Sequence, residues 1–234
     1  MDALNGERLL VAWERGLAVP QPLRPLALLE LALPEKDLTT LASMPLAERN
    51  ALLVELRAIT FGRIIEAFAT CPACDSPLEF ALHAEDVLPE RAAPTEDVWV
   101  EAGIEMHMRA ANTADLVAAA GASSEDDACA LMLARTMGIN QEELDSFNHA
   151  HWLERFEQLN QAAEMQCALT CSACENRSDL DFDIAGFLWR EVGAAARRLL
   201  AEIDRLASAY GWTERAIITL SPARRNAYLE LLNS

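Results

Sequence analysis

The sequence predicts an α+β, mainly helical protein. Two observations lead to this class. Apolar residues recur at helical spacing over both ends of the chain, and the motif Thr-Cys-x-Ala-Cys occurs twice, each time followed by the alternating apolar residues of a β-strand. We therefore divide the chain into five parts: an N-terminal helical region (1–69), the first half of a zinc ribbon (70–83), an acidic α+β insert (84–164), the second half of the zinc ribbon (165–184) and a C-terminal helical region (185–234).

The two hooks read TCPACDSPLEFAL from Thr70 and TCSACENRSDLDFDI from Thr170. A Cys-x-x-Cys turn presents two thiolates to one metal ion, and two such turns complete a tetrahedral four-sulfur site. Between Cys74 and Cys171 lie 96 residues, whereas a compact zinc ribbon allows about 15–20. The pattern predicts one zinc ribbon split by the insert. Its ligands are Cys71, Cys74, Cys171 and Cys174, and because they fill the coordination sphere the zinc is structural.

The main alternative for a Cys-x-x-Cys motif is a redox pair. A thioredoxin-like motif lies between a strand and a helix, whereas here a strand follows each hook, which argues against redox chemistry. Cys167, four residues before Cys171, is either a substitute ligand or a packed core thiol in phase with Met165 and Leu169. We interpret Cys129, on a helix of the insert, as a packed thiol.

The charge and the hydropathy of the chain argue against several classes of function. The formal net charge is −18, and residues 84–164 carry 17 acidic against 4 basic side chains. The chain as a whole lacks the basic footprint that non-specific nucleic-acid binding requires. We find neither a signal peptide nor an apolar run long enough to span a membrane. Six cysteines without a secretory signal indicate a reducing compartment.

The N-terminal region is expected to form successive helices. The first is capped by Asn5 and has Leu9, Leu10, Trp13 and Leu17 on one face. Short helices follow from Pro25 and from near Pro34, and a longer one is capped by Ser43. We expect its helical pattern to continue after Gly62 through Ile64, Ile65 and Phe68 up to the first hook.

In the insert, alternating apolar residues on both sides of Gly103 predict a hairpin. Asn112 or Thr113 caps a helix, a second helix ends at Gly138, and a third covers residues 149–162. A strand containing Cys167 then leads into the second hook.

The longest helix is expected over Ile184–Tyr210, ended by Gly211, with further helices starting at Thr213 and Ser221. Basic side chains collect in this region. They form a candidate surface for an acidic partner or simply a solvated helix face: Arg190, Arg197, Arg198, Arg205, Arg224 and Arg225.

We find no motif for catalysis. The chain has no Gly-rich phosphate loop, no Gly-x-Ser-x-Gly and no His-Glu-x-x-His. His83-Ala84-Glu85 has the form used by zinc deaminases, but it follows the Cys-x-x-Cys that it should precede. We therefore expect a protein that is not an enzyme.

The chain resembles the baseplate hub assembly proteins of contractile-tailed bacteriophages and related contractile injection systems. The resemblance lies in the hooks and in four segments around them: WERGL, LAERNALLVELR, AGFLWRE and SAYGWTERAIITLSPARRNAYLELL. It implies a non-enzymatic chaperone or minor component that meets hub or spike proteins in the cytoplasm of the bacterial host, with the four hook cysteines as a metal site.

An alternative is a zinc-ribbon adaptor in host regulation, which would bind a polymerase or another regulatory protein. A third option, an enzyme with an open zinc site, would require one hook cysteine to be dispensable for metal binding. The sequence leaves open the oligomeric state, the surface that meets the partner and whether the protein stays in the finished particle. It also leaves open an origin in a phage, a prophage or an injection system.

Overall fold

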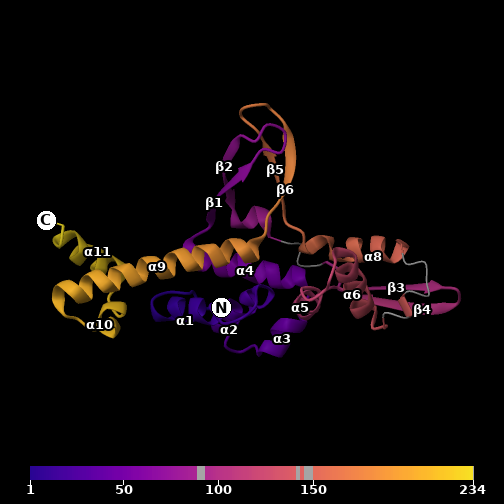
Figure 1. The fold of residues 1–234 in the computed structure, drawn as a ribbon, viewed down its shortest axis with the longest axis horizontal. Coiled ribbons are helices and arrows are strands. Elements are labelled where there is room, and N and C mark those ends of the chain that lie inside the picture. The colour runs from indigo at the N-terminus through magenta and orange to yellow at the C-terminus, as the bar shows by residue number, and fades with distance from the viewer. Residues whose placement is uncertain (89–92, 141–142, 145–149, 234) are drawn as a thin grey trace.

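A computed structural model describes residues 1–88, 93–140, 143–144 and 150–233 (Figure 1). Helices form an elongated body, and two β-hairpins project from its middle (Figure 1). The last two helices of the chain lie at one end of the body and the insert lies at the other (Figure 1). The mainly helical α+β prediction is confirmed, while the division into five parts stays a prediction.

The helices of the body come from both ends of the chain. The N-terminal ones are α1 (Glu7–Leu17), η1 (Gln21–Leu23), α2 (Arg24–Ala32), α3 (Leu38–Ser43) and α4 (Leu46–Phe61). The C-terminal ones are α9 (Ile184–Tyr210), α10 (Glu214–Ile218) and α11 (Pro222–Leu231). None of the helices in the described ranges combines the length and apolar character needed to cross a bilayer.

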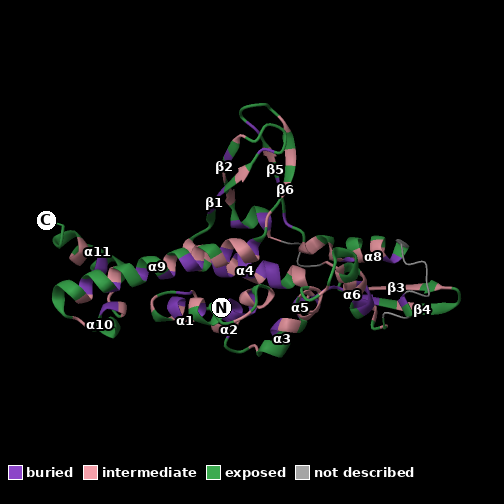
Figure 2. Ribbon diagram, viewed as in Figure 1, coloured by how far each residue is buried: buried purple, intermediate pink, exposed green. Residues whose placement is uncertain are grey.

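The main core lies where the N-terminal helices meet the first turns of α9. It contains buried residues of α1, α2, α4 and α9, among them Leu28, Leu53 and Leu188, and Figure 2 shows this buried interior in purple. Burying such a side chain stabilises the fold by about 1.5–3 kcal/mol. Two details of α1 differ from the prediction: Gly6 rather than Asn5 is its N-cap residue, and Leu17 is exposed.

Three antiparallel two-stranded sheets occur in the described residues. They pair β1 (Ile64–Thr70) with β2 (Pro77–His83), β3 (Glu96–Glu101) with β4 (Ile104–Arg109), and β5 (Gln166–Thr170) with β6 (Arg177–Asp181). The expectation that the helical pattern continues to the first hook is wrong, because residues 64–70 form β1. Its side chains alternate between buried and exposed positions, which is the period of a strand.

The insert has a buried cluster of its own. Its helices are η2 (Ala84–Val87), α5 (Thr113–Ala119), α6 (Glu125–Met137), α8 (Ala150–Asn160) and η3 (Gln161–Ala163). Trp152 and Leu133 are fully buried in this cluster, against Met108 of β4. Of the two predicted caps, Asn112 is the N-cap residue and Thr113 is the first residue of α5. The predicted end at Gly138 is confirmed, while the expected start of the third helix at His149 lies outside the described residues.

The long helix α9 starts and ends where the sequence predicts. Asp183 caps its first turn by accepting a hydrogen bond from the backbone N–H of Gly186, and Gly211 ends it in the left-handed region at φ 67°. Its first half covers the main core. Its second half packs on Leu10 of α1 and Ile217 of α10 in a separate cluster.

Candidate metal centre

The two projecting hairpins, β1–β2 and β5–β6, face each other through their apolar sides. Strand alternation turns Ile65, Ala67 and Leu78 of the first hairpin inward, and Cys167 and Leu169 do the same in the second. Their outward neighbours are exposed. The contact between the two hairpins brings together segments whose matching residues are 100 positions apart in the sequence.

Each hook is a turn between the two strands of its hairpin, and the turns have the same hydrogen bonds. The backbone N–H of Cys71 donates to the carbonyl of Ser76, and that of Asp75 donates to the carbonyl of Cys71, both at 2.9 Å. The second hook repeats both bonds at the same length with Cys171, Asn176 and Glu175. Asp75 and Glu175 both have positive φ, 57° and 59°. This left-handed residue reverses the chain immediately after the second cysteine of each hook.

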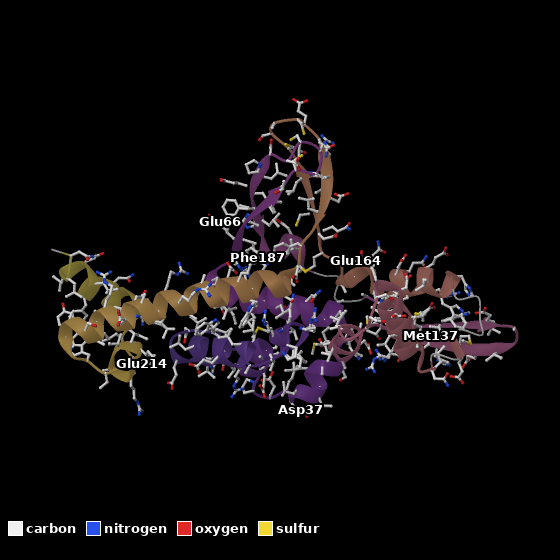
Figure 3. The ribbon with its side chains drawn as sticks, in the orientation of Figure 1. Asp37, Glu66, Met137, Glu164, Phe187 and Glu214 are labelled. Carbon is white, nitrogen blue, oxygen red and sulfur yellow. The ribbon has the colours of Figure 1, made fainter. Side chains whose placement is uncertain are left out.

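The hooks meet in reciprocal pairs, so that the first cysteine of one lies beside the second cysteine of the other. Cys71 Sγ is 3.7 Å from Cys174 Sγ, and Cys74 Sγ is 3.7 Å from Cys171 Sγ. All four sulfurs lie within 4.8 Å of one another, and sulfur atoms gather near the end of the hairpins in Figure 3. With zinc–sulfur bonds of about 2.3 Å, the edge of a tetrahedron is about 3.8 Å. The spacing therefore fits one tetrahedral metal ion.

Hydrogen bonds and neighbouring sulfurs move the cysteine pKa values in opposite directions. A hydrogen bond between the Cys74 sulfur and the Ser76 hydroxyl, together with one to the backbone of Ser76, lowers the pKa of Cys74 to about 6. For Cys174 the hydrogen bond from the backbone N–H of Asn176 acts to lower the pKa, but the Cys74 sulfur, dehydration and the other sulfurs outweigh it and raise the pKa to about 12. Four adjacent sulfurs cannot all ionise unless a cation balances them. A divalent ion would supply that balance.

The donor set suits a soft or borderline metal. Thiolates prefer zinc and similar ions to magnesium or calcium. Cys71, Cys74, Cys171 and Cys174 would hold the ion, which would cross-link the two hairpins. The backbone N–H of Ala173 also donates to Cys171 Sγ at 3.4 Å.

The two remaining cysteines lie outside the four-sulfur cluster. Cys167 is buried in the main core, where burial raises the pKa of its thiol, so the packed-thiol interpretation fits it better than that of a ligand. Cys129 is exposed on α6. The expectation that Cys129 is packed is therefore wrong.

The predicted basic residues do not form one uniform surface. Arg190, Arg197, Arg198, Arg205 and Arg224 are exposed. Arg225 is buried and donates to Glu202 and to the carbonyl of Leu220, at 2.8 Å in each case. The guanidinium of Arg225 therefore links α11 to α9 inside the fold. Arg225 does not belong to the exposed set. Partner binding by the exposed arginines stays a prediction.

Sequence reasoning missed two parts of the site. The first is Ser76, whose Oγ lies 3.3 Å from Cys74 Sγ. The second is β1, which is one of the four strands of the two projecting hairpins. The repeat contained a signal for β1. The sequence predicts a strand before the second hook, and β1 occupies the matching position before the first hook.

Comparison with known families gives one result. A family model described as T4 bacteriophage base plate protein matches residues 28–187, which is more than half of the chain and includes both hooks and the insert. The searches of curated proteins and of solved structures found no match.

Proposed function

Because the chain belongs to the T4 bacteriophage base plate protein family, we propose that it is a non-enzymatic assembly factor for the baseplate hub. It acts as a chaperone or a minor component in a contractile phage tail or injection system. Its partners in this proposal are hub or spike proteins, which it meets in the cytoplasm of the bacterial host.

The proposal also includes a structural metal ion. The observation that carries this part is the convergence of four thiols from two distant hooks. The four sulfurs lie within 4.8 Å of one another, so we propose that they bind one zinc ion. Zinc with four sulfur ligands has no free position for water or substrate. In this role the ion stabilises the two hairpins and does not catalyse a reaction.

Native mass spectrometry tests the metal part of the proposal. We expect one zinc per chain in the wild type, and loss of zinc in Cys171→Ser. Cys129→Ser is the matched control, because that thiol is exposed and lies outside the cluster, and it should retain the metal. A wild-type chain that is folded without metal would refute the structural zinc.

Assembly in cells tests the biological part. Deleting the protein should reduce the yield of baseplates, and the wild-type protein should co-purify with hub or spike proteins. Normal baseplate assembly without the protein, combined with binding to a host polymerase, would instead support the regulatory adaptor. The same preparation shows whether the protein remains in finished particles.

A further inference from the structure

The strand β1 has one unpaired edge. The carbonyl of Arg63 accepts from Ala84, and the N–H of Cys71 donates to Ser76, so odd-numbered residues of β1 bond to β2. The backbone N–H and C=O groups of Glu66 and Phe68 therefore point away from β2. In the part of the chain that the structure describes, no strand pairs with this edge.

The exposed face of β1 carries two large apolar side chains, Ile64 and Phe68, on either side of Glu66. Phe68 is 76% exposed and Ile64 is 55% exposed, and no other large apolar side chain among the described residues is as exposed as Phe68. An exposed edge strand is normally protected by a lysine, a proline or a bulge. β1 contains only one charged residue, Glu66, and no proline.

The second hairpin shows that folding does not need this aromatic ring. Ala168 lies three residues before Cys171, as Phe68 lies three residues before Cys71. Ala168 is also exposed, on a strand with equivalent pairing. The two hairpins thus form the same structure with alanine or phenylalanine at this position. The ring of Phe68 is consequently better explained by a partner than by the fold.

The edge opens on a groove of about 360 Å³ between the hairpins and the start of α9. Residues 66–69 of β1 line one side, and Phe182, Phe187 and Arg190 are among the residues that line the rest. Figure 3 places Glu66 and Phe187 near the base of the hairpins. Four consecutive residues of one strand can border a groove in this way when the strand edge faces it.

The charge of the hairpins indicates the chemistry of the partner. Residues 64–83 and 166–183 carry seven acidic side chains and one arginine. A second copy of this chain would bring two such acidic surfaces together. A basic segment would be attracted instead.

We propose that the free edge of β1 binds an extended, basic segment of another baseplate protein by strand addition. The segment's backbone pairs with Glu66 and Phe68. Its alternate apolar side chains pack on Phe68, and its basic side chains face the acidic hairpins. Only the identity of the partner as a baseplate protein rests on the proposed function.

Hydrogen–deuterium exchange on the full, zinc-loaded chain tests this edge with a defined probe. The probe is a seven-residue peptide of alternating lysine and valine, compared with a glutamate–valine peptide and with a lysine–valine peptide that is N-methylated on its pairing edge. We expect only the unmethylated basic peptide to slow exchange of the Glu66 and Phe68 amides. Phe68→Ala should weaken its binding by about tenfold. Val100→Ala is the matched control, since Val100 is 70% exposed on another two-stranded sheet, and it should bind normally.

Three results would overturn the proposal. They are no protection of the two amides, equal binding by Phe68→Ala, or dimerisation of the chain through β1. Zinc content of the variant verifies that it is folded. If peptide binding fails while baseplates still require the protein, only the strand-addition proposal falls; if assembly proceeds without the protein, the proposed function falls whatever the peptide does.

Discussion

Cys71 Sγ and Cys174 Sγ lie 3.7 Å apart although 103 positions separate them in the chain. Cys74 and Cys171 form the reciprocal pair at the same distance. A cross-link that closes a loop of about 100 residues stabilises the folded state by about 4–5 kcal/mol in the chain-entropy treatment. A metal at this point would thus have a large effect on the hairpins, which have few buried residues of their own near the hooks.

Removing the metal should unfold the hairpins before the rest of the molecule. With a strong chelator present, we expect the backbone amides of β1, β2, β5 and β6 to lose protection in hydrogen exchange. Amides of α6 and α8 should keep theirs, because the insert has a separate buried cluster around Trp152. Uniform loss of protection across the chain would contradict this independence. Unchanged protection of the hairpins would contradict a structural metal.

The sequence predicted which four cysteines come together, because the two hooks repeat each other. Cysteine spacing within each hook is local information, and the repeat Thr-Cys-x-Ala-Cys indicated that both hooks serve one site. The limits of α9 were also predicted, since Asp183 and Gly211 are strong local end signals and the apolar stripe between them is long.

The predictions that failed concern positions whose structure or exposure depends on contacts with other elements. Ile64, Ile65 and Phe68 suit a helical pattern as well as a strand, and only pairing with β2 selects the strand. Arg225 looked like an exposed residue of α11, but Glu202 of α9 pairs with it and it is buried. The two cases differ, because β2 follows β1 directly after the hook, so the repeat of the hooks carried the information for this strand. Glu202 lies 23 positions before Arg225 on another helix, and local sequence does not show that α9 and α11 pack together.

Gly16 should be sensitive to substitution, because it lies at the contact between α1 and α9. A Cβ atom on Gly16 would overlap the indole ring of Trp189, which is held under the guanidinium of Arg24. We expect Gly16→Ala to lower the free energy of unfolding by about 1–3 kcal/mol, as measured by urea denaturation. Gly193→Ala is the control. Its Cβ would meet its nearest neighbours at 3.7 Å, so the substitution should be neutral or stabilising by up to about 1 kcal/mol.

Arg57 joins α4, α9 and the start of β1. Its guanidinium donates to both carboxylate oxygens of Glu191, at 2.9 and 2.8 Å, and to the carbonyls of Gly62 and Ile64. The side chain is buried. Arg57→Met should therefore lower the free energy of unfolding by about 2–4 kcal/mol, because it leaves the partly buried carboxylate of Glu191 and two backbone carbonyls without their donor.

An exposed arginine gives the matched comparison for Arg57. Arg15 pairs with Glu30 at 2.9 Å, but the two side chains are 49% and 34% exposed, far more than Arg57. Arg15→Met should cost at most about 1 kcal/mol. Equal losses in the two variants, measured in the same urea titration, would show that the Arg57 contacts add no more than a surface ion pair.

Asp115 should make the stability of the insert depend on pH. Its buried carboxylate accepts hydrogen bonds from Arg109, from Arg135 and from the backbone N–H of Asn112. Burial acts to raise the pKa of Asp115, but these hydrogen bonds outweigh it and hold the pKa below its usual value. The stabilisation is therefore fully present above the unfolded-state pKa of about 3.9 and is lost as the pH falls through the lower pKa of the folded state.

Replacing this carboxylate tests the sign of that dependence. At pH 7 we expect Asp115→Asn to lower the free energy of unfolding by about 2–4 kcal/mol, because Arg109 and Arg135 lose their counter-ion. The difference from the wild type should shrink as the pH falls from about 5 to about 2, where the wild-type carboxylate becomes neutral. Asp126→Asn, at an exposed position in the first turn of α6, should remain close to the wild type throughout. A difference between Asp115→Asn and the wild type that stays constant with pH would mean that the ionised carboxylate does not stabilise the insert.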